Sequence, residues 1–371
     1  DRGRPELAAD VLDLLVKRYP EHDLLDASLV WLLQYHASAE AAWAFRTEAT
    51  TVTTGGMLAA GPTVAPAGNG VAPASFQAAD PARSASNIAL YQQPVMPPRN
   101  REAWTAQYGE MIRHTRPSLY WEPRVRFPLA CTDRATSRRQ DAESYFQQLV
   151  STRPMDCWWA CGRGELWIQD PRRRSPKTVI RSTRVAERPR LDGRLDDAAW
   201  ADCLPLTLTS PHGDDADWPA AVMLAYDEQF LYLAASCGKS PTSTGEIAQE
   251  SARPRDADLA DHDRLDILID VDRDYVTYFQ LTVDHRGWAR DACLGSLAWN
   301  PQWYIAASET PRTWQVEAAI PWTELQATAP APGDHWALGI QRVVPGAGFQ
   351  SWTVPASPDI LPAGFGLLGF E

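Results

Sequence analysis

The sequence predicts an α+β multidomain protein, with N-terminal helical segments followed by a C-terminal antiparallel β-sandwich. Before residue 189, apolar residues recur every three or four positions in several segments, which is typical of helices with one buried face. After residue 189, short apolar runs alternate with polar positions between Gly, Pro and Asp, which is typical of sandwich strands. At 371 residues, the chain is long enough for two or three domains.

Residues 1–47 are predicted to form a helical hairpin-like segment. Leu7, Val11 and Leu14 mark a first helix, and a second follows the break at Pro20, since a residue before proline disfavours helix. Ser38 is expected to cap a third, short helix. The segment resembles the edge of a tetratricopeptide-type helical array, a surface through which another protein could bind.

The next two segments differ in composition. Residues 48–98 are rich in Ala, Pro, Gly, Thr and Ser and are predicted to be a linker or surface loop, because they lack apolar residues for a core. Residues 99–188 are predicted to be a mixed, largely helical, basic segment. Its apolar stripes end at Pro117 and Pro154.

Residues 189–371 are predicted to form the sandwich. The pattern Trp314–Ile320 places apolar side chains on one strand face and mostly polar ones on the other, so one face of the sheet is dry and one wet. Trp200, Trp322 and Trp336 are expected in the core with Trp314. The predicted strands are 221–227, 230–235, 265–269, 278–283, 314–320, 336–341 and 365–370.

Charge and hydropathy limit the class of partner. The formal net charge is −12 and is concentrated after residue 190, so the C-terminal half would repel nucleic-acid phosphates. No uncharged apolar run of about 18 residues is present, so no membrane-spanning helix is expected. Residue 1 is Asp rather than Met, and we expect a fragment of a larger protein.

No constellation of catalytic residues is found in the sequence. The Gly-x-Ser-x-Gly nucleophile turn, the His-Glu-x-x-His zinc motif, the phosphate loop and the dinucleotide fingerprint are absent. Cys157 and Cys161 form the one close pair among six cysteines and lack the further ligands of a zinc site. We therefore predict that the chain is not an enzyme.

Five motifs follow one another in the C-terminal half: Arg190–Trp200, Ala225–Tyr232, Asp263–Asp270, Trp314–Trp322 and Gly364–Leu368. Together they resemble the family 9 carbohydrate-binding modules, which are DOMON-like β-sandwiches. The resemblance implies a non-catalytic sandwich that binds sugar, often at a chain end, with bound calcium supporting the fold. It also favours a secreted or extracytoplasmic protein with a role in carbohydrate catabolism.

The resemblance also implies positions for the sugar site. Asp266 and Gln280 should point away from the core and match strand positions that reach the ligand in that family. The family's two facing tryptophans are missing, because Leu259–Asp261 and Pro358–Ile360 stand in their places. Tryptophans in polar, loop-like segments are candidate replacements, and 299–303 is the best platform. The predicted sugar-binding residues are Trp218, Asp266, Gln280, Trp299, Asn300 and Trp303.

Asp270, Asp272 and Asp274 place carboxylates on alternate residues after a predicted strand. Hard oxygen clusters of this kind bind Ca²⁺, although the Gly and the distant Glu of an EF-hand are missing. An Asp-rich turn without metal explains the same residues, because Asp favours turns. Calcium at these three residues is therefore a prediction with an open alternative.

The sequence thus predicts a non-catalytic carbohydrate-binding module attached to a helical scaffold, with a glycan or oligosaccharide end as its ligand. One alternative is a protein–protein interaction module whose sandwich has lost the sugar clamp. Another is an accessory part of an O-glycosyl hydrolase whose catalytic domain lies outside this chain. Sugar binding requires an open water-facing side of the sheet, so a sheet covered there by the protein's own N-terminal half would contradict it.

Overall fold

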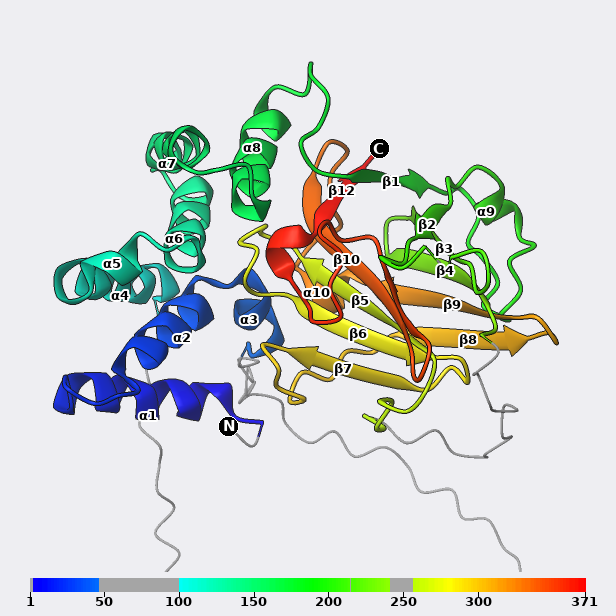
Figure 1. Ribbon diagram of the computed structural model, residues 1–371, viewed down its shortest axis with the longest axis horizontal. Coiled ribbons are helices and arrows are strands. Elements are labelled where there is room, and N and C mark those ends of the chain that lie inside the picture. Colours follow the sequence, from blue (N-terminus) through cyan, green and yellow to red (C-terminus); the bar gives the residue numbers. More distant parts are fainter. Residues whose placement is uncertain (1–2, 47–99, 214, 241–255) are drawn as a thin grey trace, which may run out of the picture. The chain divides into compact units, whose positions relative to one another are not determined.

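The computed structural model describes residues 3–46, 100–213, 215–240 and 256–371. The predicted linker 48–98 lies outside them. The described helices and strands form one compact unit (Figure 1). Among the described residues, eight helices precede the sandwich: α1 (Pro5–Arg18), α2 (Leu25–Ala37), α3 (Ala39–Ala44), α4 (Arg101–Thr115), α5 (Pro117–Tyr120), α6 (Pro123–Ala135), α7 (Arg139–Thr152) and α8 (Cys157–Gln169).

The predicted helices are present, and their ends follow from local chemistry. The hydroxyl of Ser38 accepts a hydrogen bond from the backbone N–H of Ala41 at 2.9 Å, which confirms it as the N-cap of α3. Pro117 is the first residue of α5, where its fixed φ suits a helix start. Helix α6 was not predicted, because its polar residues and the internal Pro128 obscure the helical period.

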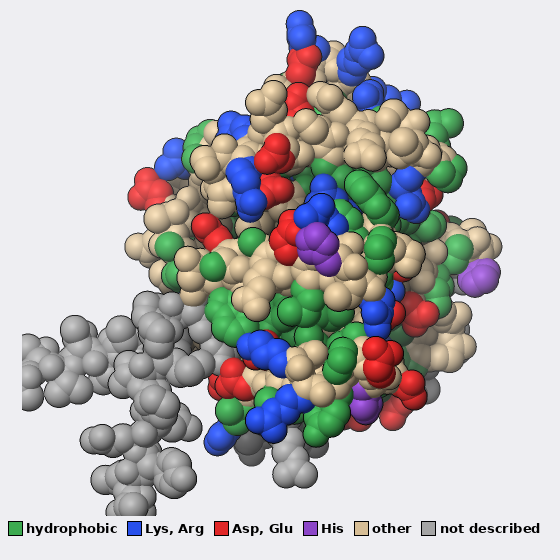
Figure 2. Space-filling model, turned by 90° about the vertical axis from the view of Figure 1, so that its left-hand side faces the viewer, with side chains coloured by type: hydrophobic (Ala, Val, Ile, Leu, Met, Phe, Trp, Pro, Cys, Tyr) green, Lys and Arg blue, Asp and Glu red, His purple; other side chains and the backbone are tan. Residues whose placement is uncertain are grey.

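Two apolar clusters hold the helices. Helices α1, α2, α4 and α6 share a core that includes Leu32, Leu33 and Tyr108. Helices α6, α7 and α8 share a second core that continues into the sandwich through Leu268 and Phe365. Figure 2 shows the side of the molecule that carries the helices, where basic, acidic and hydrophobic side chains are mixed. No described helix is both long and apolar enough to span a bilayer.

The described part of the sandwich contains twelve strands: β1 (Val179–Arg184), β2 (Leu206–Leu208), β3 (Ala220–Tyr226), β4 (Phe230–Gly238), β5 (Arg264–Asp270), β6 (Phe279–Asp284), β7 (Ala289–Cys293), β8 (Tyr304–Glu309), β9 (Thr313–Pro321), β10 (His335–Val344), β11 (Gly348–Ser351) and β12 (Gly366–Phe370). The hydrogen-bonded order is β7-β6-β5-β10-β12-β1-β3-β4-β9-β8, with β11 on β10 and β2 on β3. Neighbours are antiparallel except at β1, which runs parallel to both β12 and β3.

Strand β1 therefore joins the two layers of the sandwich. It begins at Val179, inside the segment predicted to be mainly helical, and its short polar sequence gives little strand signal. All seven predicted strands are present. The inner faces of both layers enclose one core with Trp314, Trp322 and Trp336, as expected. Trp200 is also buried, but in a separate cluster on the outer face of β3, β4 and β9.

The outer face of β5 and β10 is covered by helices at one end only. There Leu268 of β5 and Ala337 of β10 pack in one cluster with Phe127 of α6 and Phe146 of α7. The other end of the same two strands stays open and carries polar side chains. The predicted water-facing side is thus half covered by the protein's own N-terminal part and half accessible.

Candidate functional site

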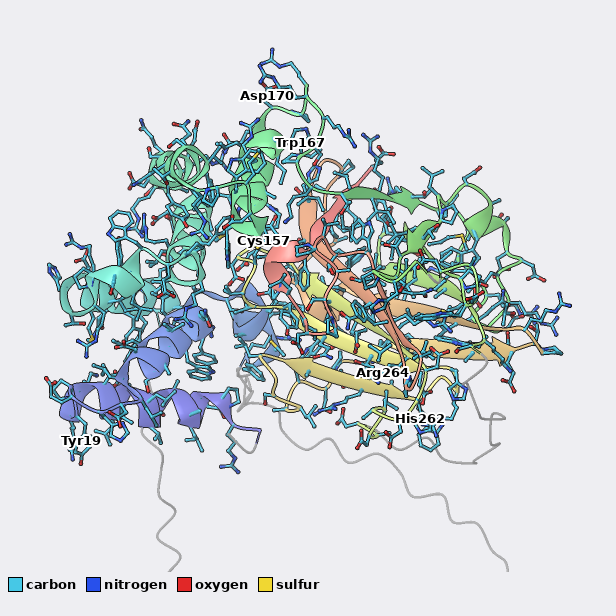
Figure 3. All side chains as sticks on the ribbon, in the orientation of Figure 1. Tyr19, Cys157, Trp167, Asp170, His262 and Arg264 are labelled. Atoms are coloured by element: carbon cyan, nitrogen blue, oxygen red, sulfur yellow. The ribbon has the colours of Figure 1, made fainter. Side chains whose placement is uncertain are left out.

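The open end of this face is a cleft with a volume of about 710 Å³. Its floor is formed by β7, β6, β5 and β10, and the turn between β10 and β11 forms one wall. Arg264, labelled in Figure 3, lies where β5 begins beside these strands. The lining residues are Leu259, Ala260, Arg264, Asp266, Gln280, Thr282, Arg290, Gln341, Val343–Phe349 and Pro358–Ile360.

The strand register aligns four polar residues across the floor. Arg290 of β7 stands opposite Thr282 of β6, Thr282 opposite Asp266 of β5, and Asp266 opposite Gln341 of β10. Because residues directly opposite one another share a face of the sheet, these four side chains form one row. Their types provide an amide, a carboxylate, a hydroxyl and a guanidinium, which are the groups that recognise hydroxyl-rich ligands.

Asp266 lies at the centre of this row and is almost fully buried beneath the cleft. Its Oδ1 accepts hydrogen bonds from the hydroxyl of Thr282 at 2.6 Å and from Nε2 of Gln280 at 3.3 Å. Its Oδ2 lies 3.9 Å from Nε of Arg264, beyond hydrogen-bonding distance. The carboxylate is therefore fixed by its neighbours and keeps acceptor capacity for a ligand hydroxyl.

Apolar side chains line the walls of the cleft. Val343, Pro345 and Phe349 come from β10, β11 and the turn between them, and Ile360 comes from the segment before β12. Phe349 is half-buried and is the one aromatic residue among those that line the cleft. An apolar wall beside a polar floor suits a ligand with CH faces and hydroxyl edges.

Two segments that the sequence analysis singled out, 259–261 and 358–360, both border this cleft. Gln341 joins the second segment to the floor, because its Nε2 donates a hydrogen bond to the carbonyl of Pro358 at 2.9 Å. Neither segment supplies an aromatic side chain to the cleft.

The predicted tryptophan platform is not at this cleft. Trp299 is only 3% exposed and lies on Phe279 in the core, with ring centroids 4.4 Å apart, so its faces are not available for stacking. Trp218 is also 3% exposed and lies over the Arg342 guanidinium. Trp303 packs partly buried against the core, and Asn300 is exposed. None of these four residues lines the cleft, whereas Asp266 and Gln280 do.

A buried ion pair anchors the 259–263 segment. Asp263 Oδ1 and Oδ2 accept hydrogen bonds from Nε and a terminal nitrogen of Arg342 at 2.9 and 2.6 Å. The same guanidinium donates to the carbonyls of Trp218 and Gly238, and the indole N–H of Trp314 donates to Asp263. Every polar group in this network has a partner, as a charge buried between two sheets requires.

A second candidate site lies at the turn between β5 and β6, where the predicted carboxylates meet one from a helix. Oxygens of Glu40, Asp270 and Asp272 lie within 4.8 Å of one another, and Asp274 is beside them. Glu40 belongs to α3, more than 200 residues away in sequence. Hydrogen bonds cross the junction in both directions, from Val271 N to Glu40 at 2.6 Å and from Ala39 N to Asp272 at 2.9 Å.

Burial and mutual repulsion act on the protonation of this acidic cluster. Burial raises the pKa of Asp274 to about 8, and the Asp272 carboxylate adds to the shift. Burial also raises the pKa values of Glu40 and Asp270. The single hydroxyl proton of Thr277 faces both Glu40, at 3.0 Å, and Asp274, at 2.8 Å, so it satisfies one of them at a time. The cluster therefore favours either a bound cation or a retained proton.

The donor set fits calcium. All donors are hard carboxylate oxygens, and two oxygens bound to one Ca²⁺ at 2.3–2.6 Å can lie no more than about 5 Å apart. None of the four carboxylates forms an ion pair with Lys or Arg within the described part of the chain. A cation held by Glu40, Asp270 and Asp272, with Asp274 beside it, would tie α3 to the sandwich.

Sequence reasoning missed Thr282, Gln341, Arg290 and Glu40. The first three occupy outward strand positions, and the register that aligns them with Asp266 is set by pairing between strands. Glu40 follows the predicted cap Ser38, but nothing near it in sequence indicates a partner in the sandwich. No disulfide joins any of the six cysteines, five of which are buried.

No family model matches the chain, and no curated protein matches it either. Among solved structures, a carbohydrate-binding module of family 9 from Caldicellulosiruptor kristjanssonii in complex with glucose is similar, with 15% identity, a TM-score of 0.39, and coverage of 52% of this chain and 96% of that one. The same type of module from that organism in complex with cellotriose gives 16% identity, a TM-score of 0.38, and coverage of 52% and 94%.

A Bacteroides uniformis protein proposed to bind carbohydrate is also similar, with 13% identity, a TM-score of 0.41, and coverage of 53% of this chain and 100% of that one. The first two structures belong to the family that residues 189–371 resemble in sequence. The tetratricopeptide-type resemblance of the first helices stays a prediction.

Proposed function

We propose that the chain is a non-catalytic carbohydrate-binding protein whose saccharide ligand occupies the cleft over β7, β6, β5 and β10. One observation carries the proposal: the register aligns Arg290, Thr282, Asp266 and Gln341 across the floor of an open cleft whose wall is apolar. This combination matches a pyranose ring, which presents hydroxyls at its edges and CH groups on its faces.

The cleft is suited to binding rather than to catalysis. Asp266 is its one buried carboxylate, and the other acidic residue in the lining, Asp359, is exposed at the rim. Glycoside hydrolysis usually needs two carboxyl groups facing one bond, with one held as an acid. Asp266 instead accepts hydrogen bonds from Thr282 and Gln280, which favours a fixed acceptor for ligand hydroxyls.

The test is calorimetric titration of the purified protein with mono- and oligosaccharides, comparing wild type with Asp266→Asn. This variant keeps the side-chain shape but removes the charge and one acceptor. A hydrogen bond to a charged group contributes about 1.5–3 kcal/mol, so affinity should fall about 10- to 100-fold. Asp202→Asn, at an exposed residue outside the cleft, is the matched control. An unchanged affinity in Asp266→Asn, with the fold intact, would refute the placement of the ligand.

We also propose that Ca²⁺ supports the fold at Glu40, Asp270, Asp272 and Asp274. The support for this is the set of three buried carboxylates and the half-buried Asp272, none of which forms an ion pair with Lys or Arg among the described residues, although Arg134 donates to the backbone carbonyl of Asp272. Adding Ca²⁺ to chelator-treated protein should raise the melting temperature, because a ligand that binds the folded state alone stabilises it. Glu40→Gln should weaken that response, whereas Glu6→Gln, at an exposed residue of α1, should not.

A protein partner is a second candidate function, and the surface of α1 favours it. Leu7, Val11 and Leu14 are 44%, 65% and 47% exposed and share one helix face at steps of four and three. This stripe fits the apolar face of a helix from a partner protein. Val11→Glu should abolish such an interaction in a pull-down while leaving saccharide binding unchanged, and a retained interaction would exclude this face.

A further inference from the structure

We propose that the cleft selects saccharides that carry an anionic substituent, and that Arg290 recognises this substituent. The inference rests on the proposed sugar-binding function of the same cleft. It goes beyond that function by assigning a charge to the ligand and a residue to its recognition. The chemical class is a sugar with a carboxylate or a sulfate ester, either of which presents coplanar or near-coplanar oxygens to a guanidinium group.

Arg290 is the cation with unused hydrogen-bonding capacity in the cleft. It lies on the edge strand β7, opposite Thr282, and is exposed. Its guanidinium makes no hydrogen bond or ion pair to the residues that the structure describes. Asp284 lies two positions along β6 from Thr282. Its carboxylate is already engaged by Arg286, with nitrogen–oxygen distances of 2.8 and 2.6 Å. Five N–H donors of Arg290 are thus available to a ligand.

Arg264, the second basic residue of the lining, has a different role. Its guanidinium donates to the carbonyls of Leu259 and Ala260, at 3.3 and 2.9 Å, and lies 3.9 Å from Asp266. It therefore supports the rim and offsets the charge of Asp266. Of the two arginines in the lining, Arg290 is the one that forms no ion pair with the described residues.

The cleft is also polarised along the row of floor residues. Arg290 and Gln341 are separated by three strand spacings, or about 14 Å. The second carboxylate of the lining, Asp359, follows Pro358, whose carbonyl is bound by Gln341, and so belongs to the far end. A guanidinium binds carboxylate or sulfate through two parallel hydrogen bonds, which a neutral hydroxyl cannot supply. The β7 end is thus suited to an anionic group, and the centre of the cleft to hydroxyls.

The test uses matched saccharide pairs in which one member carries the anionic group and the other has it esterified or removed. One pair is an oligogalacturonate and its methyl ester, and the other is a sulfated oligosaccharide and its desulfated form. Affinities are measured by calorimetry for wild type, for Arg290→Gln and for the control Arg312→Gln, an exposed arginine outside the cleft. We expect at least one acidic form to bind about 10- to 100-fold more tightly than its neutral partner. Arg290→Gln should remove this preference and Arg312→Gln should keep it.

The pair that shows the preference identifies the substituent, and either pair supports the proposal. Equal affinity for acidic and neutral forms, or a preference that survives in Arg290→Gln, overturns the assignment to Arg290 while sugar binding stands. If neither the acidic nor the neutral saccharides bind, the proposed function fails together with this inference.

Discussion

Replacing Arg342 by methionine tests the network that holds the rim of the cleft. Arg342 is fully buried, and its guanidinium makes four hydrogen bonds, two of them to Asp263. Methionine fills a similar volume but leaves the Asp263 carboxylate buried with the indole N–H of Trp314 as its remaining partner. Breaking a buried ion pair from one side costs about 3–5 kcal/mol. We expect the free energy of unfolding of Arg342→Met to fall by this amount.

Urea unfolding at equilibrium measures this loss, with the slope of the transition showing whether the same surface is exposed. Arg312→Met, at an exposed arginine, is the control and should change stability by less than about 0.5 kcal/mol. In a double-mutant cycle with Asp263→Asn, the double variant should lose less stability than the sum of the single variants, because both remove the same interaction.

The same substitution should also weaken saccharide binding. Asp263 lies two residues after the 259–261 rim, and loss of its partner removes the fixed point of that segment. A loss of stability below about 1 kcal/mol in Arg342→Met would refute the view that this ion pair anchors the rim.

Three further outcomes are expected. Without metal, the pKa values of Asp270 and Asp274 are raised, the latter to about 8, so the folded state holds protons that the unfolded chain releases near pH 4. The melting temperature should therefore fall as the pH rises from 5 to 8, and saturating Ca²⁺ should cancel this trend. A melting temperature that rises with pH in the presence of chelator would contradict the prediction. Gly193→Ala should cost about 1–3 kcal/mol in chemical unfolding, because φ is +81° and a Cβ would lie 2.7 Å from the carbonyl carbon of Ala307; an unchanged midpoint would count against this strain. Trp299→Ala should cost about 3–5 kcal/mol, as expected for a core residue, and a stable variant that loses only saccharide binding would restore the predicted platform.

Part of the candidate site could be predicted from sequence. Asp266 and Gln280 were assigned to the outward face because strand residues alternate, and both lie in the cleft. The two rim segments were singled out through the family resemblance, as the places of the missing tryptophans, and both contribute to the lining of the cleft. The burial of the tryptophans was harder to predict, because a polar sequence context does not indicate whether a side chain is buried. Trp299 lies in the loop between β7 and β8, yet its ring packs on Phe279 in the core.

By itself, the sequence determined that helices precede strands, which strand residues face the core, and where carboxylates follow β5. These are properties of hydrophobic period and turn chemistry, which act over a few residues. The tertiary structure decided which strands are neighbours, and so aligned Arg290, Thr282, Asp266 and Gln341 in one row. It also decided that helices cover one half of that face and that Glu40 reaches the β5–β6 turn. Such contacts join residues far apart in the chain, and their energy comes from packing and pairing that no local window contains.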